Sequence, residues 1–425
     1  MKLLRAFTAL AVSLLSVSAF VTPRDSDASY DGTKVLRVTA SSEEAVTKLK
    51  SLMAKLDLES WDDEIVSNVA VNIMVPQAKA ATFEAEFPDF DVVHEDLGAD
   101  IRTEAEGFAP ESFADSSSLA DLTWFTAYHA YNSHITWLNE LRTQFPNRSS
   151  IVTSGNSVEG RPITGIHIFG SGGSGSKPAV LFHGNVHARE WITSKTVEYF
   201  AYQLLTQYSN STEVKTLVDK YDFYLFPVVN PDGFSFSQSN TRLWRKNRSP
   251  APSGSTCIGT DMNRNWPTAW GQSQGASTSP CAEDFKGTSA GSTPEIKGLI
   301  SFASSLSSSR GIALYIDWHS YGQLFLYPWG YSCSVTSPNA ARYRTLGNAF
   351  ATAVRAVRST TYDVIQSCSL YVTSGGSHDH FVTALNTRDA FAVELPTNTF
   401  VLPASSINGV VQETYQGFLA LVKAL

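Results

Sequence analysis

The sequence predicts an α/β fold in which helices cover both faces of a mixed, twisted sheet, preceded by a small α+β unit with an antiparallel sheet. Two observations lead to this prediction. From residue 119 onward, apolar runs of strand length alternate with helical patterns, which is typical of an α/β sheet. The preceding segment differs in charge: residues 21–118 contain 8 Lys and Arg against 21 Asp and Glu, whereas residues 119–425 contain 22 against 19. The chain therefore joins two units that differ in net charge.

The overall composition excludes several classes of protein. The chain has 425 residues, enough for two or three domains with a large core. With 43% hydrophobic and 17% charged residues, it is too apolar to be a disordered polyelectrolyte. The formal net charge of -8 argues against a nucleic-acid partner, because nucleic-acid binders normally carry an excess of basic residues.

The first 19 residues have the pattern of a secretory signal peptide. Lys2 and Arg5 precede an apolar run over residues 6–15, and small residues follow it. The alternative is a membrane anchor, but the run is shorter than the roughly 20 residues that span a bilayer. We therefore expect a secreted, extracellular protein without a membrane partner.

Residues 20–118 are predicted to form a prosegment with a linker. The expected elements are a strand at 34–38, a helix at 42–56, a strand at 69–75 and a helix at 77–87. Between residues 104 and 118 the sequence turns to Glu, Gly, Pro and Ser without periodicity, as in an exposed linker. A permanent accessory domain is the alternative interpretation. Arg102 is one candidate for the processing point, which the sequence does not fix.

Residues 119–425 are predicted to form the main domain. Its strands are expected at 178–183, 221–229, 312–316 and 391–395, and its helices at 194–207, 293–308 and 342–357. Polar side chains stand at or beyond the carboxyl ends of these four strands: His187, Asn230, His319 and Glu394. Sheets of this kind bind ligands in the crevice beyond those ends, so we expect the active site there.

Three residues in this region point to a metal site. His187 and Glu190 form an H-x-x-E pair in a loop after a strand, and His319 follows another strand. A zinc site with an open position takes three protein ligands, and two His with one Glu is a standard set. His183 is an alternative ligand, but it ends an apolar strand and is expected to pack. The pair in His378-Asp-His380 is more typical of pocket or core residues than of a second metal site.

Seven short blocks of the sequence together resemble the motifs of a known protein family. They are His187-Ala-Arg-Glu-Trp-Ile-Thr, Val229-Asn-Pro-Asp-Gly, Arg242-Leu-Trp-Arg-Lys-Asn-Arg, Asp261-Met-Asn-Arg-Asn-Trp, Asp317-Trp-His-Ser-Tyr, Tyr371-Val-Thr-Ser-Gly-Gly-Ser and Phe391-Ala-Val-Glu-Leu. In this order and spacing, from about residue 128 to 425, the chain resembles the funnelin family of zinc carboxypeptidases, which includes carboxypeptidases A and B. One departure is that Pro396 and Thr397 follow the last block where the family often has Arg-Asp.

The resemblance implies a zinc-dependent peptide hydrolase. It assigns one Zn²⁺ to His187, Glu190 and His319, and the role of general base to Glu394. Zinc lowers the pKa of a bound water and polarises a carbonyl, while a neighbouring carboxylate takes the proton and passes it to the leaving amine. Arg245 is expected to stabilise the oxyanion, because a fixed cation beside developing charge is effective in a dry cleft.

The resemblance also implies an exopeptidase that acts on peptide and protein C-termini. Asn263, Arg264 and Tyr371 match the residues that grip the terminal carboxylate, and a guanidinium can meet a carboxylate through two hydrogen bonds. Arg189 is expected to contact the substrate further upstream. Tyr321, also expected in the substrate site, is implied to follow a cis peptide bond from Ser320.

Specificity is expected to depend on His378. This position is apolar in A-type relatives and acidic in B-type relatives, so a preference for C-terminal Lys or Arg is not expected. Gly330, Gln366, Leu370 and Thr373 match other pocket positions. We expect an A-type preference for hydrophobic or aromatic residues; the alternative is a preference for acidic residues, which a protonated His378 would attract.

The four cysteines predict two disulfides in a secreted protein. Three connectivities are open, and the pairs Cys257–Cys281 and Cys333–Cys368 close the shortest loops. Asn147 and Asn210 stand in sequons for N-glycosylation, whereas Asn247 is a poorer acceptor because Pro250 follows Ser249.

Two rival functions remain. A serine hydrolase is disfavoured because both G-x-S-x-G matches, at residues 271–275 and 287–291, lack a preceding apolar strand. A non-catalytic peptide-binding relative is the second rival, although the chain keeps all the expected ligands and the base. The acidic prosegment is expected to inhibit the main domain until an activating protease removes it.

Overall fold

The computed structural model describes residues 30–106, 108 and 121–425. The predicted signal peptide and most of the predicted linker lie outside these residues. Within them, no helix has the length and apolar character that a membrane span needs.

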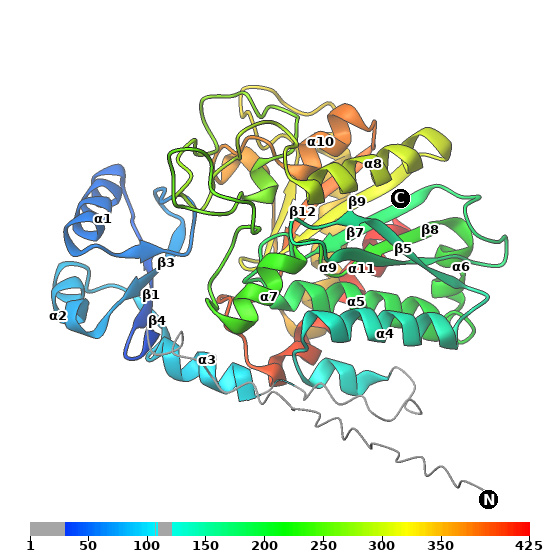
Figure 1. Cartoon of the computed structure of the whole chain (residues 1–425), viewed down its shortest axis with the longest axis horizontal. Helices are drawn as coiled ribbons and strands as arrows, with labels where there is room; N and C mark the ends of the chain where they lie inside the picture. Colours follow the sequence, from blue (N-terminus) through cyan, green and yellow to red (C-terminus); the bar gives the residue numbers. More distant parts are fainter. Residues whose placement is uncertain (1–29, 107, 109–120) are drawn as a thin grey trace, which may run out of the picture.

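The first unit is a four-stranded sheet packed against helices, as predicted (Figure 1). Its strand order is β2-β3-β1-β4 and all its neighbouring strands are antiparallel. The elements are β1 (Lys34–Thr39), α1 (Glu43–Leu56), β2 (Glu59–Ser60), β3 (Ala70–Val75), α2 (Gln77–Glu86), β4 (Asp91–His94) and α3 (Leu97–Glu106). Ser42 begins α1 as its N-cap, because its Oγ accepts a hydrogen bond from the backbone N–H of Ala45 at 3.2 Å.

The expected start of the linker at residue 104 is wrong. Helix α3 continues to Glu106, and the side chain of Glu104 is 1% exposed. Glu104 lies against the second unit, where Arg242 donates two hydrogen bonds to its carboxylate at 2.5 and 2.9 Å. A buried glutamate that depends on a partner 138 residues away leaves no periodic apolar pattern in the local sequence.

The second unit is an eight-stranded mixed sheet with the order β11-β10-β12-β9-β7-β8-β6-β5. Its strands are β5 (Ser149–Asn156), β6 (Pro162–Ile168), β7 (Ala179–Gly184), β8 (Asp222–Phe226), β9 (Ile312–His319), β10 (Leu324–Tyr327), β11 (Asp363–Gln366) and β12 (Asp389–Glu394). The α-helices are α4 (Tyr131–Gln144), α5 (Trp191–Thr206), α6 (Thr212–Lys220), α7 (Pro231–Ser239), α8 (Pro294–Ser309), α9 (Ala340–Arg358), α10 (Ser377–Ala384) and α11 (Ile407–Lys423).

The four strands expected from the sequence form the centre of this sheet. Strands β12, β9, β7 and β8 are neighbours, and each pairs in parallel with the next. Their carboxyl ends therefore meet at one edge, where the expected site residues follow. The observed strand β8 ends at Phe226, three residues earlier than expected, and β9 extends to His319.

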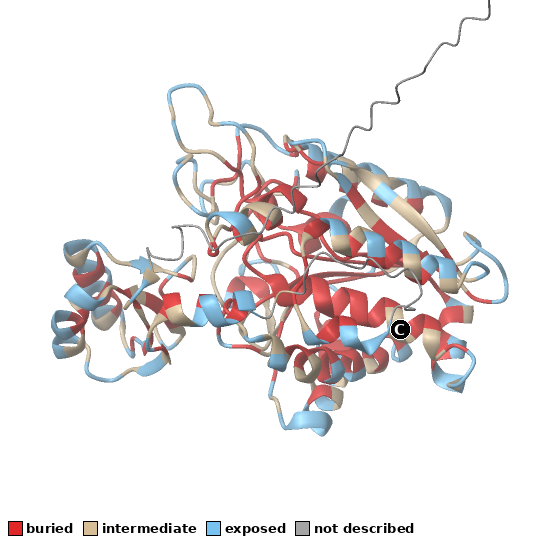
Figure 2. Cartoon of the chain, turned by 60° about the horizontal axis from the view of Figure 1, so that its bottom comes forward, coloured by how far each residue is buried: buried red, intermediate tan, exposed pale blue. Residues whose placement is uncertain are grey.

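Helices cover both faces of the sheet, as predicted, because the side chains of its central strands alternate between two cores. On β7, Val180 and Phe182 belong to the core under α4, α5, α9 and α11, whereas Ala179 and Leu181 belong to the core under α8 and α10. Figure 1 shows these two helix layers below and above the sheet, and Figure 2 shows that the central strands are buried along their length.

Both expected disulfides are present. Cys257 is bonded to Cys281 and Cys333 to Cys368, with Cα–Cα distances of 5.0 and 5.4 Å. The implied cis peptide bond between Ser320 and Tyr321 is also present.

Candidate active site

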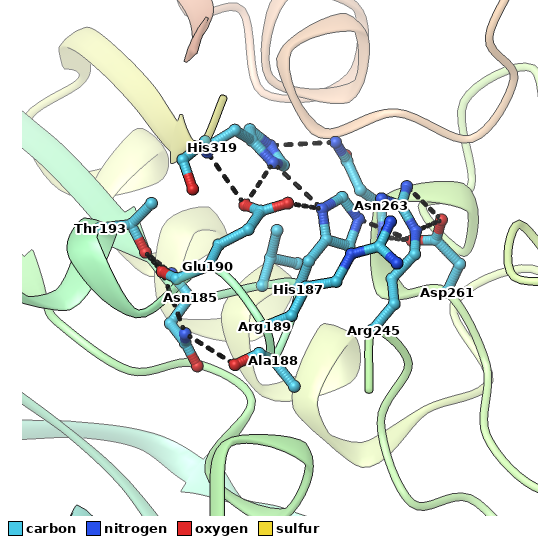
Figure 3. Close-up of polar contacts among 12 residues, drawn as sticks. Asn185, His187, Ala188, Arg189, Glu190, Thr193, Arg245, Asp261, Asn263 and His319 are labelled. Atoms are coloured by element: carbon cyan, nitrogen blue, oxygen red, sulfur yellow. Dashed lines mark hydrogen bonds and ion pairs between the residues drawn. The ribbon is translucent and has the colours of Figure 1, made fainter. Parts of the chain in front are cut away.

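The three predicted metal ligands converge at the carboxyl edge of the sheet (Figure 3). His187 and Glu190 lie between β7 and α5, and His319 is the last residue of β9. His187 Nδ1 lies 2.8 Å from Glu190 Oε1, and His319 Nδ1 lies 3.3 Å from Glu190 Oε2. One ligand atom from each residue lies within 4.8 Å of the others, and all three residues are buried. The structure thus brings together the set that the sequence predicted.

A network of hydrogen bonds fixes the loop that carries two of these residues. Asn185, directly after β7, has a left-handed backbone with φ of 56°, which Asn tolerates better than most residues. Its backbone N–H donates to Thr193 Oγ1 at 2.8 Å, and Thr193 Oγ1 donates to the carbonyl of Glu190 at 2.8 Å. These contacts hold the loop against the start of α5, so the carboxylate of Glu190 points at the two imidazoles.

The electrostatics of this cluster suit a cation. Burial alone would raise the pKa of Glu190, but the imidazoles of His187 and His319 outweigh that effect and lower it. Asp261 Oδ1 lies 3.1 Å from His187 Nε2, the ring nitrogen on the far side from Glu190. Two imidazoles and one ionised carboxylate with buried supporting groups are the donor set of an open zinc site.

Glu394 lies beside this cluster and has a free oxygen. It is the last residue of β12 and pairs with His319 in the parallel register of the sheet. Its side chain lines the same cavity, and its Oε2 has no hydrogen-bond partner among the described residues. Burial raises the pKa of Glu394 above its ordinary value. A carboxylate with a raised pKa and an unpaired oxygen is suited to accept a proton.

A group of cations forms the opposite side of the cavity. Asp261 Oδ2 accepts hydrogen bonds from Arg245 Nε and Nη2 at 3.2 and 2.9 Å, which orients that guanidinium. Arg264 follows Asn263 on the short turn after Asp261, and Asn263 Nδ2 lies 3.2 Å from His319 Nε2. The structure therefore places the expected oxyanion and carboxylate-binding residues next to the expected metal ligands.

The first unit provides the counter-charge of this cationic side. Asp63, in the loop between β2 and β3, accepts hydrogen bonds from Arg245 Nη2 at 3.1 Å and from Arg264 Nη2 at 2.6 Å. The two guanidiniums lower the pKa of Asp63, although its burial acts in the opposite direction. A single carboxylate of the first unit thus bridges both arginines.

Neighbouring residues of that loop contact the remaining expected substrate residues. Arg189 Nη2 donates to the backbone carbonyl of Trp61 at 3.0 Å, and its guanidinium stacks on Phe400. The hydroxyl of Tyr321 donates to Asp62 Oδ2 at 3.3 Å. The cavity that remains has a volume of about 390 Å³ and is lined by residues of both units.

The predicted specificity residue lies at the same cavity. His378 lines it together with Leu370 and Thr373, and its Nε2 lies 2.8 Å from Ser367 Oγ. The expected lining by Gln366 is wrong, because its amide instead bonds to backbone carbonyls of residues 329–335. Burial lowers the pKa of His378, although the carboxylates of Asp379 and Asp317 act in the opposite direction, so the imidazole is neutral at pH 7.

Three further predictions concern Tyr371, His183 and the glycosylation sequons. The phenol of Tyr371 lines the cavity, and burial raises its pKa. His183 lies outside the ligand cluster and bonds to Tyr315. Both favoured sequons, at Asn147 and Asn210, lie in exposed turns, whereas Asn247 is fully buried.

Comparison with known proteins agrees with this geometry. Residues 134–417 match the family described as zinc carboxypeptidase, and residues 36–104 match the carboxypeptidase activation peptide. The chain belongs to the zinc carboxypeptidase family. The second match replaces the accessory-domain interpretation, since it covers nearly all of the described first unit.

The similarity to individual zinc carboxypeptidases extends over the whole chain. Metallocarboxypeptidase A of Trichophyton rubrum is 38% identical over 429 residues, which is 98% of each chain. Carboxypeptidase A2 of Rattus norvegicus is 32% identical over 405 residues, or 93% of this chain and 94% of the relative. The solved structure of thrombin-activatable fibrinolysis inhibitor covers 93% of this chain and 98% of its own, with a TM-score of 0.82 and 25% identity. The chain is a metallocarboxypeptidase with an activation segment.

Sequence analysis did not assign a role to two residues of the site, Asp261 and Asp63. Asp261 lies in one of the matching blocks, but only the structure shows that it contacts both His187 and Arg245. Asp63 stands in an acidic run that resembles a solvated surface, and its contacts lie 182 and 201 residues away. The buried Trp61, two residues before Asp63, is the one local indication that the run is not fully exposed.

Proposed function

We propose that the chain is a secreted proenzyme whose processed form releases single C-terminal residues, with a preference for hydrophobic or aromatic side chains. One observation supports this proposal above the others. The predicted metal ligands, the free carboxylate of Glu394 and the guanidiniums of Arg245 and Arg264 line a single cavity.

His187, Glu190 and His319 would hold one zinc ion. When bound, zinc acts as a Lewis acid toward a carbonyl oxygen and makes a water molecule acidic near neutral pH. The donor set supports this assignment, because the two imidazoles present Nδ1 to the same carboxylate.

Glu394 would act as the general base and then as the general acid. Its unpaired Oε2 takes the proton of the attacking water and returns it to the nitrogen of the leaving residue. Arg245 would stabilise the negative charge that develops on the carbonyl oxygen. Its guanidinium is held by Asp261, so it needs no reorganisation during the reaction.

Asn263, Arg264 and Tyr371 would bind the terminal carboxylate. Asp63 supports this role, because a carboxylate of the first unit already pairs with Arg264 at 2.6 Å. Binding of a carboxylate at a fixed distance from the metal ligands restricts cleavage to the last peptide bond.

The environment of His378 favours an uncharged C-terminal residue. A preference for acidic residues would need a protonated imidazole, and burial lowers the pKa of His378. Leu370 adds apolar surface to the same cavity. We therefore keep the A-type preference and treat acidic preference as the alternative.

The first unit would inhibit the enzyme by occupying its substrate site. Asp63 pairs with both arginines, and Trp61 and Asp62 contact Arg189 and Tyr321. Asp63 occupies the Nη2 donors of Arg245 and Arg264 that face the substrate cavity, so it competes with a substrate carboxylate for them. An activating protease is therefore required to separate the units.

Mass spectrometry of a peptide pool tests this function. Peptides with free and with amidated C-termini are incubated with the processed protein, with and without a zinc chelator. We expect loss of single terminal residues from the free peptides only, stopped by the chelator, and the identity of the released residues reports the preference. Intact peptides in the presence of bound zinc would favour the non-catalytic binding alternative.

A further inference from the structure

Asp317 is a buried carboxylate beside a predicted metal ligand, and it has no role in the function proposed above. It lies two residues before His319 on β9, so both side chains point to the same face of the sheet. Asp317 is fully buried, and its Oδ2 lies 3.1 Å from His319 Nε2. That nitrogen is the one that does not face Glu190.

The second histidine of the ligand set has the same arrangement. His187 directs Nδ1 toward Glu190 and Nε2 toward Asp261, at 2.8 and 3.1 Å. His319 directs Nδ1 toward Glu190 and Nε2 toward Asp317, at 3.3 and 3.1 Å. In metal centres, a carboxylate at the far ring nitrogen fixes the tautomer and orientation of a ligand imidazole and raises its basicity. Each histidine of this site therefore has a carboxylate of its own.

Asp317 forms an ion pair with His319 at this nitrogen. Asn263 Nδ2 lies 3.2 Å from the same His319 Nε2, but an amide nitrogen is a donor. When His319 binds a metal through Nδ1, its Nε2 carries a proton and needs an acceptor. The carboxylate of Asp317 meets that need.

Neighbouring groups hold the carboxylate in place. Ser377 Oγ, at the start of α10, donates to Asp317 Oδ2 at 2.7 Å. On the other side, Asp317 Oδ1 lies 3.2 Å from His183 Nδ1 as an ion pair, and neither atom has a hydrogen-bond partner among the described residues. Because His378 directly follows Ser377, the same contacts tie the metal side of the cavity to the helix that forms the specificity pocket.

Asp317 also needs a nearby positive charge. Within the part of the chain that the structure describes, its ion-pair partners are two imidazoles, His183 and His319. A buried carboxylate is strongly unfavourable without a nearby positive charge. His319 supplies that charge when it is protonated or when it is bound to a divalent cation.

We propose that Asp317 is a positioning residue of the metal centre, which orients His319 as Asp261 orients His187 and thereby tightens metal binding. This inference rests on the proposed function, because it takes His187, Glu190 and His319 as the zinc ligands. Removal of such a supporting carboxylate typically weakens metal affinity by about 10- to 100-fold.

The test is the zinc affinity of the full-length proenzyme, measured by competition with a chromophoric chelator. We expect Asp317→Asn to weaken zinc binding by roughly 10- to 100-fold, similar to Asp261→Asn. The absorption spectrum of the cobalt-substituted protein should change as well, since it reports the ligand field at the metal. The matched control is Asp222→Asn: Asp222 is equally buried and lies 3.5 Å from His167 Nε2, on strands remote from the cavity. The control should bind zinc as the unmodified protein does.

Ser377→Ala gives a second, milder variant. It leaves the carboxylate of Asp317 but removes its anchor, so we expect a smaller loss of zinc affinity in the same direction, even if Asp317→Asn does not fold. The inference is overturned if zinc affinity in both variants stays within twofold of the Asp222→Asn control. If the unmodified processed enzyme still cleaves peptides in that case, only this inference fails and the proposed function stands.

Discussion

The two sides of the active-site cavity differ in how their charges are satisfied. On the metal side, the partners of His187 and His319 all come from the second unit: Glu190, Asp261 and Asp317. On the cationic side, the first unit contributes a decisive partner, because Asp63 bridges two arginines. Removal of the first unit therefore leaves the metal side intact and takes Asp63 away from the cationic side, where Arg245 keeps Asp261 and Arg264 becomes open to a substrate carboxylate.

The largest effect is expected on the metal side, from Glu394→Gln. The amide keeps the shape of the side chain but cannot accept the proton of water, so we expect kcat to fall by about 10²- to 10⁴-fold. Zinc content and KM should stay close to those of the unmodified enzyme, because Glu394 is not one of the three ligands. Steady-state kinetics on the processed protein, with metal analysis of the same sample, checks this. Unchanged turnover in the variant would show that Glu394 is not the general base.

On the cationic side, Arg264→Met should impair binding of the substrate carboxylate. We expect kcat/KM for peptides with a free C-terminus to fall by roughly 100-fold, because a buried carboxylate loses its charged partner. Zinc affinity should not change, since Arg264 contacts no ligand residue. The informative measurement is the ratio of cleavage of free and amidated peptides, which should fall. An unchanged ratio would place the carboxylate site elsewhere.

Asp63→Ala should weaken the link between the two units. The variant leaves Arg245 and Arg264 open to substrate, so we expect the uncleaved proenzyme to gain peptidase activity by at least about tenfold over the unmodified proenzyme. The exposed Asp91 on β4 provides the control, since Asp91→Ala removes a carboxylate of the same unit that does not pair with Arg245 or Arg264. Equal activity in both variants would show that Asp63 does not block the site.

The smallest effect is a pH dependence of the contact between the units. Burial raises the pKa of Asp62 from 3.8 to about 6. A carboxyl whose pKa is raised in the complex stabilises the complex when it is protonated, whereas Asp63, whose pKa is lowered, stabilises the complex when it is ionised, so the cleaved first unit should bind most tightly near pH 4. Its affinity should fall between pH 4 and 6, by at most tenfold per pH unit, and should level off above pH 6. Asp62→Asn should flatten this profile in fluorescence titrations of the cleaved complex, and an unchanged slope in the variant would assign it to another group.

Sequence analysis predicted the metal side better than the contacts between the units. The four central strands are long apolar runs with polar residues at their ends, so both their place in the sheet and the position of His187 and His319 follow from local patterns. Helix α3 has few apolar residues and is held by the pair of Glu104 with Arg242, which no local pattern reveals. The role of Asp63 likewise depends on how the two units dock.

The measurement that tests the account most directly combines metal analysis and turnover on one sample, before and after removal of the first unit. We predict one zinc per chain in both states, no turnover before cleavage, and chelator-sensitive release of single residues from free C-termini after it. Zinc that binds only after cleavage would contradict a metal side complete within the second unit. Equal turnover before and after cleavage would contradict the role of Asp63 on the cationic side.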